Sequence, residues 1–236
     1  MRALRRGLFV LLVLAVLFAG ADRLAVKLAE DEAAERIRSA EGVSSSTEAS
    51  VDIKGFPFLT QIAGRELEQI DAELNGIKAG PGEDDLTVSR VDAQLKKVRI
   101  GSDYSSAVAE EATGSAFVSY KELTKAAHEG VRVGWGGKDE NGKGRVKVSA
   151  GITLLGQTFE RSVTSTVSVT KGDIVELQAD EVPGDGIPGL EGAVRERIDF
   201  ARKIAGLPPG LELERVEAKK DGIELSVRGS DIELSE

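Results

Sequence analysis

Apolar residues recur with three different spacings along the chain, and each spacing predicts a different kind of segment. An uninterrupted apolar run extends from Leu8 to Phe18. Between Val26 and Ala40 the apolar positions recur every three or four residues, as on one face of an amphipathic helix. From Thr47 onward the spacing falls to two, which is typical of strands with one face against a core. The chain is therefore expected to change from helix to strand shortly before Thr47.

Strands are predicted for most of the chain after this point. The run from Val51 to Leu59 reads as a strand, as do Leu67–Ile77 and Leu86–Ile100. Further strands follow between Val131 and Ala179 and from Leu211 to Leu234. Tight turns are predicted where glycine follows Asn, Asp or Lys between two such runs: Asn141-Gly142, Lys171-Gly172-Asp173 and Asp221-Gly222.

Three helices are predicted after the first one. Two are short and cover Ala107–Ala112 and Tyr120–Glu129. The third is long, with an apolar stripe from Leu190 to Ala205 that ends at Gly206. Helices and strands in this order predict an α+β fold with helices packed on one face of an antiparallel sheet. No break in composition divides residues 22–236, so one domain is expected there.

The first 21 residues have the features of an export signal. Arg2, Arg5 and Arg6 precede the apolar run, and the small residues Ala19-Gly20-Ala21 follow it. Signal peptidase accepts such a small-residue pattern, so cleavage before Asp22 is predicted. The alternative is an uncleaved membrane anchor. Both interpretations place the remainder of the chain outside the cytoplasm.

Composition excludes several classes of function. The 236 residues are 41% hydrophobic, enough for a packed core, but contain no Cys and one His. Disulfides, zinc–thiolate centres and clusters of histidine ligands are thereby excluded. Thirty-one basic residues stand against 40 acidic ones, and a net charge of −9 argues against a nucleic-acid partner. No cofactor site is evident, and a non-enzymatic protein is expected.

Individual motifs have ordinary explanations. Residues 184–189 match G-x-G-x-x-G, but Pro188 and the lack of a βαβ unit argue against dinucleotide binding. Asp139 and Asn141 are better explained by a hairpin turn than by a calcium loop. The acidic residues from Glu30 to Glu35 are expected to form the solvated face of the first helix. A hydrolase using a carboxylate pair stays open, although no pair stands out.

Three stretches together resemble the LmeA-like phospholipid-binding family of actinobacterial envelope proteins. The first runs from Gly55 through Phe56-Pro57-Phe58 to Gly64, and the second from Leu207 to Leu213. The third is the helix opening Asp22-Arg23-Leu24-Ala25. The resemblance covers essentially all of residues 22–236, although its middle third matches only in pattern.

This resemblance implies a fold similar to bactericidal/permeability-increasing and tubular lipid-binding proteins. In that fold a long, curved antiparallel sheet wraps amphipathic helices and encloses an apolar cavity. The implied function is binding of phospholipid or another acyl-chain lipid, in support of envelope lipid or lipoglycan assembly. Contact with the membrane surface is also expected. The alternative is a membrane-tethered interaction module with a packed core and no ligand.

The candidate cavity residues share an apolar side chain on a predicted strand, helix or loop that borders the expected cavity. They are Phe56, Phe58, Leu59, Ile62, Val131, Val133, Leu154, Phe159, Val194, Ile198 and Leu207. The cluster from Phe56 to Ile62 suits a cavity entrance or a membrane-contact surface, and it equally suits an edge strand that caps the core. Trp135 is interpreted as a packing residue near a loop, with a position at a cavity rim as the alternative.

Overall fold

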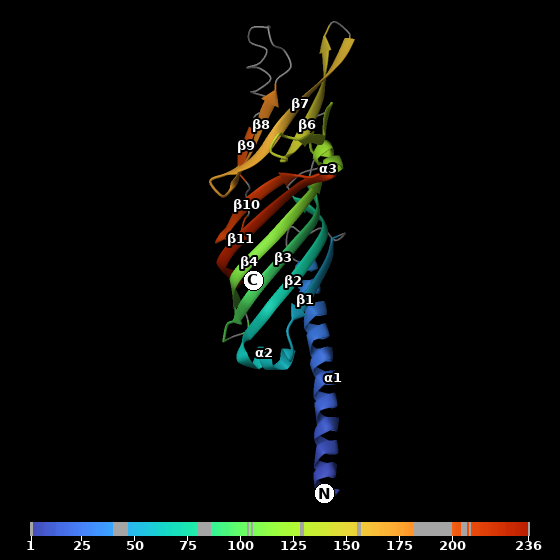
Figure 1. Ribbon diagram of the computed structural model, residues 1–236, viewed down its shortest axis with the longest axis vertical. Coiled ribbons are helices and arrows are strands. Elements are labelled where there is room, and N and C mark those ends of the chain that lie inside the picture. The colour runs from blue at the N-terminus through green and yellow to red at the C-terminus, as the bar shows by residue number, and fades with distance from the viewer. Residues whose placement is uncertain are drawn as a thin grey trace.

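The protein combines one long helix with two antiparallel sheets that follow one another along the long axis of the molecule (Figure 1). The computed structural model describes residues 2–39, 47–79, 86–102, 104, 106–127, 130–154, 157–181, 200–203, 207 and 209–235. The predicted α+β class with a large antiparallel sheet is confirmed.

Helix α1 (Arg2–Ser39) continues without interruption through the predicted cleavage site. Its 38 residues correspond to a length of about 57 Å. Every side chain from Leu4 to Phe18 is exposed, whereas Val26 and Ala34 are buried. The N-terminal half of α1 therefore projects from the body, and the C-terminal half packs against it (Figure 1).

The first sheet has six antiparallel strands in the order β1-β2-β3-β4-β11-β10. Its strands are β1 (Glu48–Lys54), β2 (Glu66–Ala79), β3 (Leu86–Ile100), β4 (Ser106–Ser119), β10 (Leu211–Ala218) and β11 (Gly222–Ser235). The sheet is open, with β1 and β10 at its edges. Helix α1 lies beside β1, where Glu30 Oε1 accepts a hydrogen bond from the Ile53 amide at 2.8 Å. Glu30 is thus half-buried and bonded, unlike the solvated residue expected from the sequence.

The second sheet has five antiparallel strands in chain order. They are β5 (Val131–Lys138), β6 (Gly144–Leu154), β7 (Gln157–Thr170), β8 (Ile174–Glu181) and β9 (Phe200–Lys203). All three predicted tight turns are confirmed, and in the one between β5 and β6 the Gly142 amide donates to the Asp139 carbonyl at 3.0 Å. Two short helices, α2 (Phe58–Gly64) and α3 (Tyr120–Lys125), join strands.

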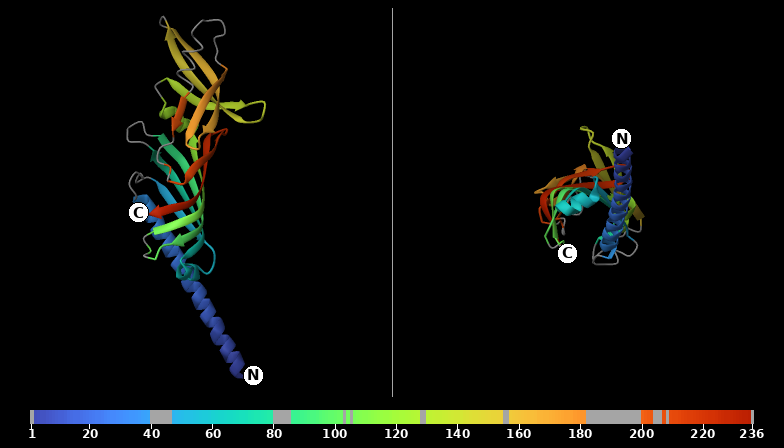
Figure 2. Two further views of the ribbon diagram at one scale, coloured as in Figure 1. Left: turned by 90° about the vertical axis from the view of Figure 1, so that its left-hand side faces the viewer. Right: turned by 90° about the horizontal axis from the view of Figure 1, so that it is seen from below.

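Two apolar clusters stabilise this arrangement. The first, which we call the helix cluster, joins α1 and α2 to the first sheet; its buried members are Val26, Phe58, Leu67, Val98, Ala109, Ala112 and Ile232. Seen from below, α2 lies inside the curve of this sheet, next to α1 (Figure 2, right). The second, the junction cluster, takes residues from both sheets and α3; its buried members are Tyr120, Val146, Val167, Leu213, Val216 and Ala218.

Three predicted elements are wrong. Residues 107–112 were expected to be helical but lie in β4, where β3 and β11 pair with them on both sides. Their Ala and Glu residues favour helix intrinsically, and pairing overrides that preference. The strand expected at residues 56–59 is replaced by a loop and the start of α2, whose N-cap is Pro57.

The long helix predicted from Leu190 to Ala205 is wrong at Ala201, which lies in β9 and pairs with Glu176 of β8. Residues 190–199 and 204–205 lie outside the described residues. His128 and the G-x-G-x-x-G segment also lie outside them. The short helix predicted from Tyr120 is confirmed as α3.

Candidate functional site

The six-stranded sheet has one apolar face, on the side of α2. Three consecutive rows of cross-strand neighbours on this face contain no polar side chain. The middle row is Val51, Ala72, Ala93, Gly114, Val227 and Leu213. The row on one side is Ala49, Leu74, Val91, Ala116, Leu225 and Val216, and the row on the other is Ile53, Ile70, Leu95, Ala112, Gly229 and Leu211. The alternation of strands thus creates an apolar surface across all six strands.

The two clusters cover only the two ends of this face. Ile53, Ile70 and Leu95 pack against the helix cluster, and Leu225 and Val227 pack against the junction cluster. The side chains between these ends belong to neither cluster and are half-buried. We call them the apolar band: Ala49, Val51, Ala72, Leu74, Val91, Ala93 and Ala116. Within the described part of the chain, the band is therefore apolar surface that is only partly covered.

Side-chain size varies across the apolar band. Ala72, Ala93 and Gly114 are neighbours on β2, β3 and β4, so a stripe of small residues crosses three strands. Leu74 and Val91 stand on one side of the stripe. Neighbouring rows on one face of a sheet lie about 7 Å apart. The larger side chains thus border a lower stripe whose floor is alanine and glycine.

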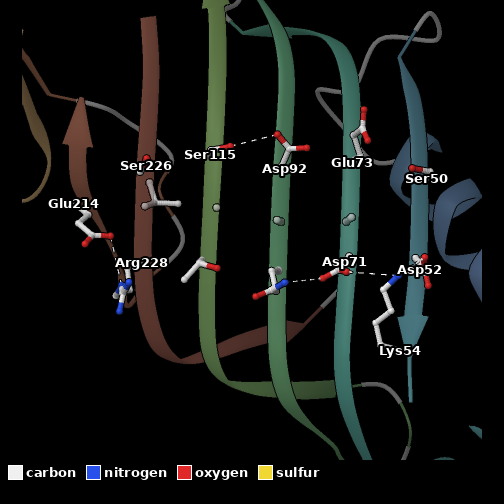
Figure 3. A pocket seen from close by; sticks show the side chains of 16 residues that line it. Ser50, Asp52, Lys54, Asp71, Glu73, Asp92, Ser115, Glu214, Ser226 and Arg228 are labelled. Carbon is white, nitrogen blue, oxygen red and sulfur yellow. Dashed lines mark hydrogen bonds and ion pairs between the residues drawn. The ribbon is translucent and has the colours of Figure 1, made fainter. Parts of the chain in front are cut away.

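The opposite face of the sheet is polar (Figure 3). A depression of about 710 Å³ lies there, lined mainly by polar and charged side chains. Asp71 accepts hydrogen bonds from Gln69 at 2.7 Å and from Gln94 at 3.2 Å. Lys54 Nζ lies 2.5 Å from Asp52 Oδ2, and this hydrogen bond raises the pKa of Lys54. These groups satisfy one another in contact with water, so this depression is not the apolar cavity expected from the sequence.

The α2 end of the sheet is tied to α1 through Asp22. The Asp22 side chain is fully buried, and its Oδ1 accepts a hydrogen bond from the Leu59 amide at 2.8 Å. Its Oδ2 lies 2.7 Å from Nη2 of Arg23. Pro57, the N-cap of α2, makes no side-chain capping bond. Asp22 therefore supplies from another helix the carboxylate that a helix N-terminus favours.

The structure distributes the predicted cavity residues over several places. Phe58, Leu59 and Ile62 come together in the helix cluster. Phe56 instead is 60% exposed, with the Arg23 guanidinium 5.0 Å from its ring centroid. Val133 packs against the junction cluster.

Val131 in β5 and Leu207 are half-buried, and neither is a member of the helix cluster or the junction cluster. Leu154 and Phe159 lie in β6 and β7, but their side chains are outside the described part of the chain, as are Val194 and Ile198 entirely. Trp135 packs in the junction cluster, in agreement with its interpretation as a packing residue.

Sequence reasoning missed the apolar band. The signal was present in the period-two spacing of Ile70, Ala72 and Leu74 and of Val91, Ala93 and Leu95. Each strand alone shows only that one face is apolar. The pairing register, which aligns Ala72 with Ala93, is needed to find the stripe of small residues.

The comparison of the chain with known protein families agrees with the apolar face of the first sheet. The family model of LmeA-like phospholipid-binding proteins matches residues 20–228. The chain belongs to the LmeA-like phospholipid-binding family. Membership indicates lipid binding, and it confirms the resemblance carried by Gly55–Gly64 and Leu207–Leu213. No curated protein and no solved structure matches the chain.

Helix α1 has a second property that bears on lipid. It is long and apolar enough to cross a membrane, and it is the one such helix in the described residues. Its apolar half suits either a signal peptide or an anchor, which is compatible with a position in the cell envelope.

Proposed function

We propose that this LmeA-like protein acts outside the cytoplasm and holds phospholipid acyl chains in an apolar cavity over the apolar band. In this role it supports the assembly of envelope lipids or lipoglycans. The observation that carries the proposal is the partly covered apolar band within three rows that lack any polar side chain.

The energetics of this binding come from burial of methylene groups. Each CH₂ transferred from water to an apolar surface contributes about 0.8 kcal/mol. Ala72 and Ala93 form the floor on which an acyl chain lies, and Leu74 and Val91 contact its sides. Binding of this kind requires no proton transfer, nucleophile or metal, and we propose that the protein is not an enzyme.

Filling the stripe of small residues tests the proposal. Ala72→Leu combined with Ala93→Leu places larger side chains where the acyl chain would lie. The affinity for a fluorescent fatty-acyl phospholipid should fall about tenfold, which corresponds to the loss of about two buried methylenes. Native mass spectrometry of protein purified from lipid-containing cells should show less bound phospholipid.

The matched control lies on the same strand and the other face. Gln94→Leu adds an apolar side chain next to Ala93 in sequence but on the polar side of the sheet. Its lipid affinity should equal that of the unchanged protein. Equal affinity in the double leucine variant would contradict the proposed binding surface.

A membrane-tethered interaction module without a ligand is the second candidate. The observation that favours it is the unbroken α1, which joins an apolar segment directly to the body of the protein. This candidate predicts that native mass spectrometry detects no bound lipid and that the protein retains residues 1–21. Detection of a bound phospholipid would contradict it.

A further inference from the structure

The end of the first sheet that carries α2 has an unusual surface. Outside α1, the large hydrophobic side chains that are exposed in the described residues are Phe56, at 60%, and Tyr104, at 62%. Phe56 precedes α2, and Tyr104 lies in the turn between β3 and β4. These two residues are 48 positions apart in sequence, but the fold brings them to the same end.

Backbone hydrogen bonds define this common end. The Ile100 amide donates to the carbonyl of Arg65, the C-cap of α2, at 2.9 Å. The turn with Tyr104 begins directly after Ile100, where the Gly101 amide donates to the Ser106 carbonyl. Both exposed aromatic residues therefore lie at the end of the sheet from which α1 projects (Figure 1).

The length of the apolar part of α1 limits how far this end can stand from a bilayer. The uncharged stretch from Gly7 to Ala21 is about 22 Å long as a helix, whereas the hydrocarbon core of a bilayer is about 30 Å thick. No spacer residue lies between this apolar stretch and the part of α1 that is bonded to the body of the protein. The next residue, Asp22, is already bonded to α2. A retained α1 would thus draw the α2 end onto the lipid surface, since a short span favours that position.

The side chains at this end suit the membrane–water interface. Aromatic rings are enriched there because one part of the ring is apolar and another is polar or polarisable. Arg23 lies over the Phe56 ring with its own side chain half exposed, and Arg65 is exposed at the end of α2. Guanidinium groups beside an aromatic ring are suited to lipid phosphates.

From these observations we propose that the α2 end of the sheet is a membrane-seating surface. In the chain that retains α1, Phe56 and Tyr104 enter the interface of the bilayer that holds the apolar half of this helix. Asp22 fixes the angle between that helix and the sheet. This seating does not depend on capture of a lipid by the apolar band.

Tryptophan scanning of the full chain in vesicles of phosphatidylcholine and phosphatidylglycerol tests the proposal. In a Trp135→Phe background, Phe56→Trp and Tyr104→Trp each introduce one fluorophore. Both should show a blue shift and lose emission when the vesicles contain lipid brominated near the headgroup. The control, Asn141→Trp in the exposed turn between β5 and β6, should do neither. Quenching at positions 56 and 104 no stronger than at 141 would overturn the proposal.

Two further variants separate the parts of the proposal. Asp22→Ala removes the acceptor for Leu59 and should weaken the quenching at position 56, while α1 stays in the carbonate-resistant membrane fraction. Asp22→Asn keeps an acceptor oxygen and should retain the quenching. Unchanged quenching in Asp22→Ala would show that Asp22 does not fix the seating. The double variant Ala72→Leu and Ala93→Leu should leave the quenching at positions 56 and 104 unchanged. A failure of membrane seating can thus be told apart from a failure of lipid capture by the apolar band.

Discussion

Tyr120 connects α3 to the turn between β10 and β11. Its hydroxyl donates to the Lys219 carbonyl at 2.9 Å, and its amide donates to the Asp221 carbonyl at 3.1 Å. The side chain is 8% exposed. Burial, and secondarily the negative charge of Asp221, raises the pKa of Tyr120 to about 12. The folded protein therefore favours the neutral phenol.

A pH dependence at alkaline pH follows from this raised pKa. The stabilisation is fully present below the unfolded value near pH 10 and is lost as the pH rises toward 12. In Tyr120→Phe the contribution of this residue should disappear, so the loss of stability above pH 10 should become shallower. The raised pKa values of Lys54, Lys97 and Lys219 account for the slope that remains. The free energy of unfolding at pH 7 should fall by about 1 kcal/mol through loss of the hydrogen bond.

Urea denaturation at several pH values measures both effects. The control is Tyr104→Phe, which alters an exposed residue and should leave stability at pH 7 unchanged. An equally steep loss of stability between pH 10 and pH 12 in Tyr120→Phe would assign the slope to another group.

At the scale of elements, the two sheets meet closely at Gly144. A Cβ at this position would overlap the Ala218 carbonyl oxygen of β10 and approach Cζ3 of Trp135 to 2.9 Å. The start of β6 can therefore lie against the end of β10 only because residue 144 lacks a side chain.

Gly144→Ala is expected to lower the free energy of unfolding by about 1–3 kcal/mol, since backbone atoms must shift. Gly134→Ala is the matched control in β5, where an added Cβ meets nothing within 4 Å. Chemical denaturation compares their stabilities, and the near-ultraviolet signal of Trp135 reports the junction. Similar stabilities for the two variants would contradict close packing at Gly144.

Elements whose signals are local were predictable from the sequence. Asn141-Gly142 determines its turn through the positive φ of Gly142, at 79°. Gly222 is instead required by close approach, because a Cβ there would overlap the Val118 carbonyl oxygen. Both hairpins are confirmed. Predictions failed where partners distant in sequence decide the outcome. Ala107–Ala112 becomes a strand through pairing with β3 and β11, and α2 is stabilised by Asp22, which lies 37 positions before Leu59.

The candidate site was less predictable than the fold. Family resemblance pointed to lipid, and hydrophobicity pointed to the conspicuous cluster from Phe56 to Ile62. Phe58 of that cluster is buried in the helix cluster, so its side chain cannot line a cavity. The partly covered surface consists instead of small residues such as Ala72 and Ala93. These residues can be recognised as neighbours only when the pairing register of the strands is known.

At the scale of the whole molecule, the two halves of α1 have separate roles. Residues 4–18 contact solvent throughout, while Ala25, Val26 and Ala29 pack in the helix cluster. A chain that starts at Asp22 should consequently stay folded, with a thermal unfolding midpoint close to that of the full chain in detergent. A chain that starts at Ile37 should unfold at a much lower temperature, because it loses the packed half of α1.

Circular dichroism on heating compares these truncated chains. Equal midpoints for the chains starting at residues 22 and 37 would mean that α1 adds nothing to the body. A severe loss of stability on removal of residues 1–21 alone would contradict the separation of roles.

The hydrogen bond between Glu30 and the Ile53 amide has a consequence for behaviour in a crowded envelope. An exposed edge strand has unpaired backbone groups, so a strand from a neighbouring molecule can pair with it and start aggregation. Here α1 occupies that position along β1 and engages one of its free amides. The same helix that leads toward lipid thus covers one edge of the sheet, and a chain that lacks α1 is expected to associate with its own copies through β1.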